Sequence, residues 1–229
     1  MPVLPDNTNI KKSKRARRMS IRVRHDGSVT MTVPYFTPTS LARKFLNSKS
    51  DWVNQQLSQI KSEQHSFANG QVIGKAHRII FQCHEGPLKS TVRNNLVIIS
   101  MPHGAEIDDP LLQKTAKNAV FRALRKEARA YLPKRLDTLA GRFGFIYEEI
   151  RLKNASTRWG SCSNAKNINL NIQLMRLPHH LIDYVIVHEL CHLKHQNHSQ
   201  DFWYLLETIL PEAKEHRREL RSYSILYRD

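Results

Sequence analysis

Residues 181–192 read LIDYVIVHELCH, an apolar run that ends in a His-Glu-x-x-His pattern. Pro178 precedes this run and suits the first turn of a helix, where its missing N–H is not needed. Because an α-helix has about 3.6 residues per turn, His188 and His192 project from the same face. We therefore predict a helix over residues 178–194 that is anchored inside the protein and presents two imidazoles side by side.

The two histidines and the glutamate between them have the chemistry of a hydrolytic metal site. Neutral imidazole nitrogens bind zinc at about 2.0–2.1 Å. Glu189 follows His188 directly, so its carboxylate is placed to accept the proton of a metal-bound water. Zinc lowers the pKa of that water to about 7 and polarises a carbonyl group. The pattern predicts a Zn2+ site, with another divalent metal as the alternative, and Glu189 as the general base.

A catalytic zinc site needs a third protein ligand and an open fourth position. His198 follows His192 by six residues, and Asn197 can end the helix in a left-handed conformation that turns the chain back. His195 competes for this role, but a straight helix carries it about 10 Å along the axis from the first histidine. The spacing therefore favours His198 as the third metal ligand. Weaker candidates from the following helices are Glu207 and Glu212.

Two predicted strands precede the helix, over residues 147–152 and 167–174. The second strand alternates apolar residues with asparagines, which is typical of a strand with one buried face. As an edge strand, residues 167–171 would pair with an extended peptide by β-augmentation. The substrate-binding candidates beside this cleft are Arg158, Ser161 and Asn169, and Arg158 is placed to stabilise a developing oxyanion.

The other notable side chains near the motif have structural interpretations. Trp159, Phe202 and Trp203 are expected to pack against the active-site helix rather than to bind a ligand. Cys162 and Cys191 are expected to be small buried residues, because neither has a base placed to make it a nucleophile.

Four segments give this region a specific resemblance to a known family. They are RWGSCS at 158–163, INLN at 168–171, IDYVIVHELCHL at 182–193 and NHSQDFW at 197–203. In this order they resemble the YgjP-like metallopeptidase family, which is related to the SprT and WLM groups of zincins. The segments KKSKRARRMSIRVRHDGSVTMTVP at 11–34 and FLNSKSDWV at 45–53 resemble the N-terminal region of that family. The resemblance implies a zincin-like C-terminal domain with a small sheet, an active-site helix and a third ligand at His198.

The N-terminal part is predicted to be rich in strands. Residues 20–24 and 29–33 alternate apolar and polar side chains around the turn His25-Asp26-Gly27, which is typical of a β-hairpin, whereas residues 1–18 look polar and loose. The other expected elements are a helix over 39–62, strands over 72–73, 77–83 and 96–100, a basic helix over 108–139 that Pro133 should kink or break, and helices over 199–209 and 211–223.

These elements predict an α+β protein with two parts. Residues 1–105 would form a basic, β-rich N-terminal module with one helix, and residues 106–229 a zincin-like metallohydrolase domain.

The net charge of the chain indicates a polyanionic partner. The 229 residues include 36 Lys+Arg and 20 Asp+Glu, which gives a formal net charge of +16. We expect non-specific nucleic-acid contact through the basic N-terminal region, although this stretch itself has no aromatic residue on which a base could stack. The cations that crowd it are Lys11, Lys12, Lys14, Arg15, Arg17, Arg18, Arg22 and Arg24.

Cysteine usage and hydropathy indicate the compartment. The three cysteines form no CxxC pair, which favours a reducing interior over a disulfide scaffold. The basic N-terminal stretch is not followed by an apolar segment, so we expect no signal peptide, and no apolar run is long enough to predict a membrane span. We expect a cytoplasmic protein.

A zinc metallopeptidase with protein or peptide substrates is the function that these patterns favour. The basic charge keeps two alternatives open: a metal-dependent hydrolase of nucleotides or phosphate esters, and a SprT-like protease that acts on nucleic-acid-associated proteins. A metal-binding module without turnover is disfavoured by the presence of Glu189.

Overall fold

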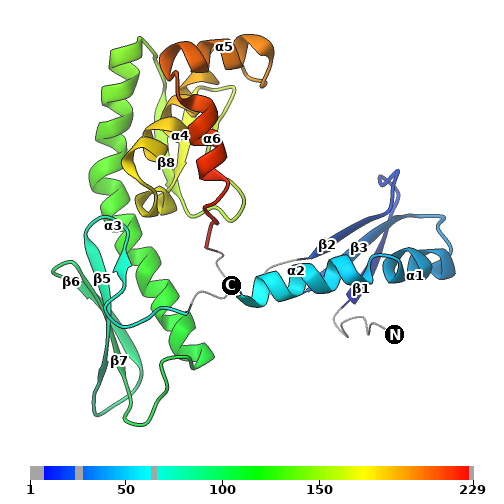
Figure 1. The fold of residues 1–229 in the computed structure, drawn as a ribbon, viewed down its shortest axis with the longest axis horizontal. Coiled ribbons are helices and arrows are strands. Elements are labelled where there is room, and N and C mark those ends of the chain that lie inside the picture. Colours follow the sequence, from blue (N-terminus) through cyan, green and yellow to red (C-terminus); the bar gives the residue numbers. More distant parts are fainter. Residues whose placement is uncertain (1–7, 24–27, 63–65, 227–229) are drawn as a thin grey trace. The chain divides into compact units, whose positions relative to one another are not determined.

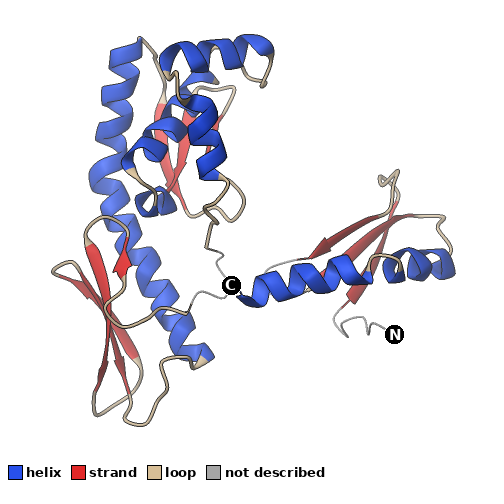
Figure 2. Cartoon of the chain, in the orientation of Figure 1, coloured by secondary structure: helices blue, strands red, loops and turns tan. Residues whose placement is uncertain are grey.

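A computed structural model describes residues 8–23, 28–62 and 66–226, and the chain divides into two compact units, Met1–His65 and Ser66–Arg228 (Figure 1). In the described ranges, three small sheets and six α-helices confirm the predicted α+β class (Figure 2). The division differs from the expected boundary at residues 105 and 106. Residues 66–105 lie in the second unit, because their sheet shares its buried core with the long helix that follows.

The first unit contains a three-stranded sheet. Its strands β1 (Thr8–Ser13), β2 (Ser20–Val23) and β3 (Val29–Pro34) have the order β1-β3-β2. The antiparallel pairing of β2 with β3 confirms the predicted hairpin, whose turn at residues 25–27 lies outside the described residues. The expectation that residues 1–18 are loose is wrong for residues 8–13, since β1 pairs in parallel with β3, and residues 1–7 lie outside the described residues. Local alternation carries little information about such a pairing, because it depends on a partner strand elsewhere in the chain.

Two helices cover one face of this sheet. They are α1 (Thr39–Asn47) and α2 (Ser50–Ser62), where the sequence predicts a single helix over 39–62. The hydroxyl of Ser48 donates to the carbonyl of Phe45 at 2.8 Å, a local bond that competes with helix continuation. The apolar core of the unit is formed by Met31, Val33, Ala42 and Leu46.

The second unit begins with a four-stranded sheet of order β4-β5-β7-β6. Its strands are β4 (Val72–Ile73), β5 (His77–Cys83), β6 (Lys89–Arg93) and β7 (Leu96–Met101). Three of them are confirmed predictions, and β6 was not predicted because charged side chains at both ends mask its alternation.

The long helix α3 (Pro110–Phe143) joins this sheet to the rest of the unit. The carboxylate of Asp109 caps its first turn by accepting from the amides of Leu111 and Leu112, and Gly144 ends it with a φ of 69°. Pro133 does not break the helix, contrary to one of the two predicted outcomes. Buried leucines on both sides of Pro133 hold the helix in the core, so packing outweighs the lost hydrogen bond.

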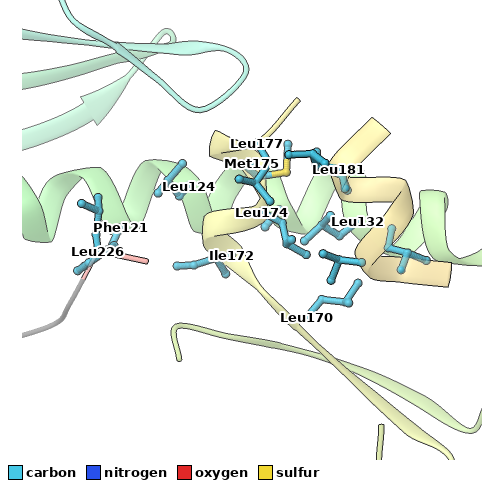
Figure 3. Packing of buried hydrophobic residues seen from close by; sticks show 14 of the residues in the cluster. Phe121, Leu124, Leu132, Leu170, Ile172, Leu174, Met175, Leu177, Leu181 and Leu226 are labelled. Atoms are coloured by element: carbon cyan, nitrogen blue, oxygen red, sulfur yellow. The ribbon is translucent and has the colours of Figure 1, made fainter. Parts of the chain in front are cut away.

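A second small sheet and a short 3-10 helix pack on α3 on the way to the motif. The sheet has the order β8-β10-β9, with β8 (Glu149–Lys153), β9 (Gly160–Cys162) and β10 (Asn167–Asn171). The predicted strand over 167–174 ends at Asn171, and the residues after it form η1 (Ile172–Arg176). Figure 3 shows Ile172 and Leu174 packed beside Leu124 and Leu132 of α3.

Three further helices complete the unit: α4 (His179–Cys191), α5 (Gln200–Ile209) and α6 (Ala213–Leu220). Helix α4 is the predicted motif helix, and nine of its residues are buried. None of the helices in the described ranges is long and apolar enough to cross a membrane.

Candidate metal centre

Helix α4 fixes the first two histidines of the motif. His188 lies in its last turn, and His192 is the residue at which the helix ends. The centres of the two imidazole rings are 5.0 Å apart, as expected for side chains four residues apart on one face. The buried residues around them, such as Val185 and Leu190, anchor the helix in the core of the unit.

His198 joins these two residues from the turn after α4. Its Nε2 lies 3.0 Å from the Nε2 of His188, and its ring centre lies 4.7 Å from that of His192. One nitrogen from each of the three imidazoles lies within 4.8 Å of the other two. His195, the competing candidate, is not part of this group, and Glu207 pairs instead with Lys214 at 3.0 Å.

Two aromatic side chains of α5 position the three rings. Phe202 is fully buried, and its ring centre lies 4.5–4.9 Å from all three imidazole centres. Trp203 stacks on His198 at 5.6 Å. Both aromatic side chains thus pack against the motif, as predicted from the sequence, and Phe202 contacts all three imidazoles of the histidine cluster.

The chemistry of this donor set fits a metal ion. The Nδ1 of His192 lies 2.9 Å from the carbonyl oxygen of His195, which can only accept, so this nitrogen carries the hydrogen and leaves Nε2 free to donate a lone pair. Burial and the neighbouring histidines lower the pKa of His188 to about 3, and burial also lowers the pKa of His198. Both imidazoles are therefore neutral at physiological pH, which is the form that binds a metal.

Glu189 lies against strand β9 rather than in solvent, and only 6% of its surface is exposed. Gly160 lies so close that an added Cβ there would meet the Cγ and Oε1 of Glu189 at 2.7 Å. The Cys162 backbone N–H donates to the Glu189 carboxylate, and the positive charge of Arg158 also acts on it. The segment Arg158–Cys162 thus lies against this carboxylate, and Gly160 leaves the space for it. A glycine within a strand can indicate such a close approach, but we did not predict this role from the sequence.

We predict that Gly160→Ala displaces Glu189, the expected general base, and lowers hydrolytic activity by about 100-fold while metal content is unchanged, because small misplacements of a general base have effects of this size. The measurement is peptide hydrolysis together with metal content. Gly141→Ala is the matched control, since a Cβ there meets nothing within 4 Å and activity should be unchanged. Equal activities of the two variants would contradict the assigned role of Gly160.

Burial raises the pKa of Glu189 from its ordinary 4.5 to about 8, against the opposing effects of Arg158 and the Cys162 amide. The folded state therefore holds an extra proton between these pH values, and the stability that this proton contributes is present below pH 4.5 and lost as the pH rises through 8. Raising the pH from 5 to 7 should destabilise the metal-free wild type by about 2–3 kcal/mol relative to Glu189→Gln. Urea unfolding with a chelator measures this, and parallel pH profiles would contradict it.

The remaining predicted site residues are placed differently. Arg158 is exposed and acts on Glu189 through its charge. The Nδ2 of Asn169 donates to the Ser161 hydroxyl at 3.1 Å. These two side chains lie on the face of the sheet opposite to that of Gly160, because successive strand residues alternate between faces. The structure therefore does not bring Ser161 and Asn169 together with the histidines.

Strand β10 is not the edge strand that the sequence suggested. It lies between β8 and β9, so its two sides are already paired. The edge next to the motif helix belongs to β9. The Trp159 carbonyl and the Ser163 amide bond to β10, so the main-chain groups of Gly160 and Cys162 point toward the open edge.

The two nearby cysteines are not activated. Burial raises the pKa of the Cys162 thiol to about 11 and that of Cys191 to about 12. Both thiols are therefore protonated at physiological pH, which excludes thiolate nucleophiles at these positions and agrees with their expected structural role.

Arg217 of α6 is a candidate site residue that no sequence motif indicates. Its guanidinium lies 4.5 Å from the ring centre of Trp203, and its charge lowers the pKa of both His188 and His198. Helix α6 thus brings a second arginine to the centre, on the side of Trp203, whereas Arg158 is close to Glu189. Only the fold brings this distant residue to the motif.

Three imidazoles close together, with a buried carboxylate on the residue next to one of them, are typical of one class of protein, the metal-dependent hydrolases. Comparison with protein families narrows the class, since a YgjP-like metallopeptidase domain matches residues 17–223. The chain belongs to the YgjP-like metallopeptidase family, as its motifs suggested.

Two solved structures are similar to part of the chain. The metallopeptidase zymogen abylysin of Pyrococcus abyssi is 24% identical with a TM-score of 0.36, over 41% of this chain and 98% of that chain. The metallopeptidase zymogen jannalysin of Methanocaldococcus jannaschii is 22% identical with a TM-score of 0.36, over 39% of this chain and 93% of that chain. The search of curated proteins finds no match.

Proposed function

We propose that the chain is a zinc-dependent peptidase with a zincin-like second unit, in which His188, His192 and His198 hold the metal and Glu189 is the general base. The observation that carries the proposal is the convergence of three imidazoles next to a buried carboxylate. When bound, zinc would supply an electrophile that acidifies water and polarises a carbonyl. The all-histidine donor set suits zinc better than magnesium or calcium, which prefer oxygen ligands.

Glu189 accepts the proton of the attacking water and passes it to the leaving amine. In the metal-free protein, burial raises its pKa to about 8, close to neutral pH, where a group can both take up and release a proton. The Cys162 amide and the lack of a side chain at Gly160 hold the carboxylate in one orientation. Arg158 offers a positive charge to the oxyanion that develops on the substrate.

The substrate that fits this arrangement is an extended peptide. Strand β9 pairs only with β10 among the described strands, and the main-chain groups of Gly160 at its open edge are suited to strand addition. A peptide bound there lies beside Glu189, because Gly160 and Glu189 are in contact. Protein and peptide substrates are therefore the proposed partners of the site.

A second candidate keeps the metal and changes the substrate. Arg158 acts on Glu189 and Arg217 acts on His188 and His198 through their positive charges, and arginines also bind phosphate groups in bidentate fashion. A hydrolase of nucleotides or phosphate esters is therefore the alternative. Parallel assays of a peptide library and a nucleotide panel, each repeated with Glu189→Gln, identify the substrate class as the one whose turnover depends on Glu189.

The metal set is tested by replacing its third member. We expect His198→Ala to lower zinc content and zinc affinity by at least about 100-fold, since two imidazoles alone make an incomplete site. The measurement is elemental analysis of purified protein with competition by a chelator. His195→Ala is the matched control, a neighbouring histidine outside the cluster that should leave zinc binding unchanged. Undiminished zinc in His198→Ala would remove this residue from the ligand set.

A further inference from the structure

The first unit carries half of the surplus positive charge of the chain. Residues 1–65 contain twelve Lys+Arg and four Asp+Glu, a surplus of eight against the +16 of the whole chain. Among the described residues of this unit, the one carboxylate is Asp51, in the first turn of α2. The ion pairs found within the described ranges all lie in the second unit. The charge of the first unit is therefore not neutralised within these ranges.

One face of the first sheet carries polar and cationic side chains. Helices α1 and α2 belong to the other face, where Met31 and Val33 are buried. On the helix-free face, the strand register forms two rows across the sheet that hold only hydroxyl, amide and cationic groups. The first row is Asn9, Thr30 and Arg22, and the second is Lys11, Thr32 and Ser20.

The fold adds aromatic rings at one end of this sheet. Strand β1 ends, β2 begins and β3 ends at the same side of the sheet, since Ser13 pairs with Pro34 and Ser20 with Thr32. Tyr35 and Phe36 directly follow β3 and are 48% and 93% exposed. Lys14 lies over the Tyr35 ring at 5.5 Å. The basic stretch has no aromatic residue of its own, and the turn after β3 supplies two.

We propose that this face, with the Tyr35–Phe36 turn, binds single-stranded nucleic acid. A cationic surface that follows the phosphates, combined with exposed aromatic rings on which bases stack, is the usual arrangement of such binders. Lys11 and Arg22 contact phosphates, the hydroxyl and amide side chains contact phosphate and sugar oxygens, and Phe36 stacks on a base. This activity is separate from the proposed hydrolysis and uses no residue of the metal centre.

Charge and composition favour a polynucleotide over other polyanions. A membrane-bound element needs a broad apolar face beside its cations, whereas both rows of this sheet are polar. Phe36 is nearly fully exposed, so an aromatic partner such as an unpaired base can cover it. In a duplex the bases are already stacked and offer no such partner.

The first test uses the full-length protein and fluorescence anisotropy of a labelled oligonucleotide, single-stranded or annealed to its complement. We expect the single strand to bind more tightly than the duplex, and Phe36→Ser to weaken single-strand binding at least about fivefold. Ile146→Ser removes a similarly exposed apolar side chain in the second unit, 79% exposed, and should change nothing. Tighter binding of the duplex, or an equal effect of the two variants, would overturn the proposal.

The second test separates the surface from general charge attraction. Arg22→Glu should reduce the slope of log affinity against log salt by about 0.7 or more, the contribution of one phosphate contact in a single strand. Arg43→Glu makes the same charge change on α1, an exposed position of the helical layer, and should alter the slope less. Equal changes of the salt slope in Arg22→Glu and Arg43→Glu would show that the binding depends only on the net charge of the protein. Phosphatidylserine vesicles that bind more tightly than the oligonucleotide would identify a membrane surface instead.

Discussion

Glu189→Gln is expected to lower peptide hydrolysis by about 1,000-fold, within the usual 10²–10⁴ range for a general base. The glutamine keeps the shape of the side chain but cannot accept the proton of the attacking water. Because the three imidazoles are on other residues, metal content should equal that of the wild type. The variant thereby separates loss of the base from loss of the metal.

The matched control for this variant is Glu106→Gln, which makes the same substitution at an exposed carboxylate in the loop before α3. Its activity should equal that of the wild type. The measurement is kcat/KM for a cleaved peptide, with zinc content determined on the same samples. Full activity of Glu189→Gln would show that the cleavage is carried out elsewhere, and loss of zinc in this variant would contradict the separation of roles.

The parts of the site that could be predicted from the sequence are those set by local spacing. Two histidines four residues apart on a helix project from the same face whatever surrounds them, and a gap of six residues is short enough to bring His198 back to them. Gly160 and Arg217 carry no such local signal. They reach the centre through contacts of β9 and α6 with α4, which depend on the packing of the whole unit.

The fold, like the site, could be predicted from the sequence only where it depends on local patterns. The predicted strands and helices are mostly present, because alternation and helical periodicity are local. The parallel partner of β3, the central place of β10 in its sheet and the boundary near residue 65 depend on pairings between distant segments. The boundary lies near residue 65 because the sheet β4-β5-β7-β6 packs against the long helix α3 and so belongs to the same unit.

Glu127 links the sheet β4-β5-β7-β6 to the long helix α3. It lies on α3, is 7% exposed and accepts hydrogen bonds from the turn between β4 and β5. Its Oε2 accepts from the Lys75 amide at 2.7 Å, and its Oε1 accepts from the amides of Ala76 and His77 at 3.0 Å. The His77 ring adds a contact of 2.6 Å between Nδ1 and Oε1. An added Cβ at Gly74 would collide with this carboxylate, which leaves no room for a side chain there.

We expect Glu127→Ala to destabilise the second unit by about 3–5 kcal/mol, because it leaves buried backbone donors and the His77 ring without their acceptor. Glu127→Gln keeps an oxygen for the Oε1 partners but turns an amide nitrogen toward the Lys75 N–H, so its cost should be about 1–2 kcal/mol. Glu106→Ala removes an exposed carboxylate and should stay within about 0.5 kcal/mol of the wild type. Urea unfolding followed by tryptophan fluorescence measures all three. A free energy of unfolding for Glu127→Ala no lower than that of Glu106→Ala would show that the turn is held by packing alone.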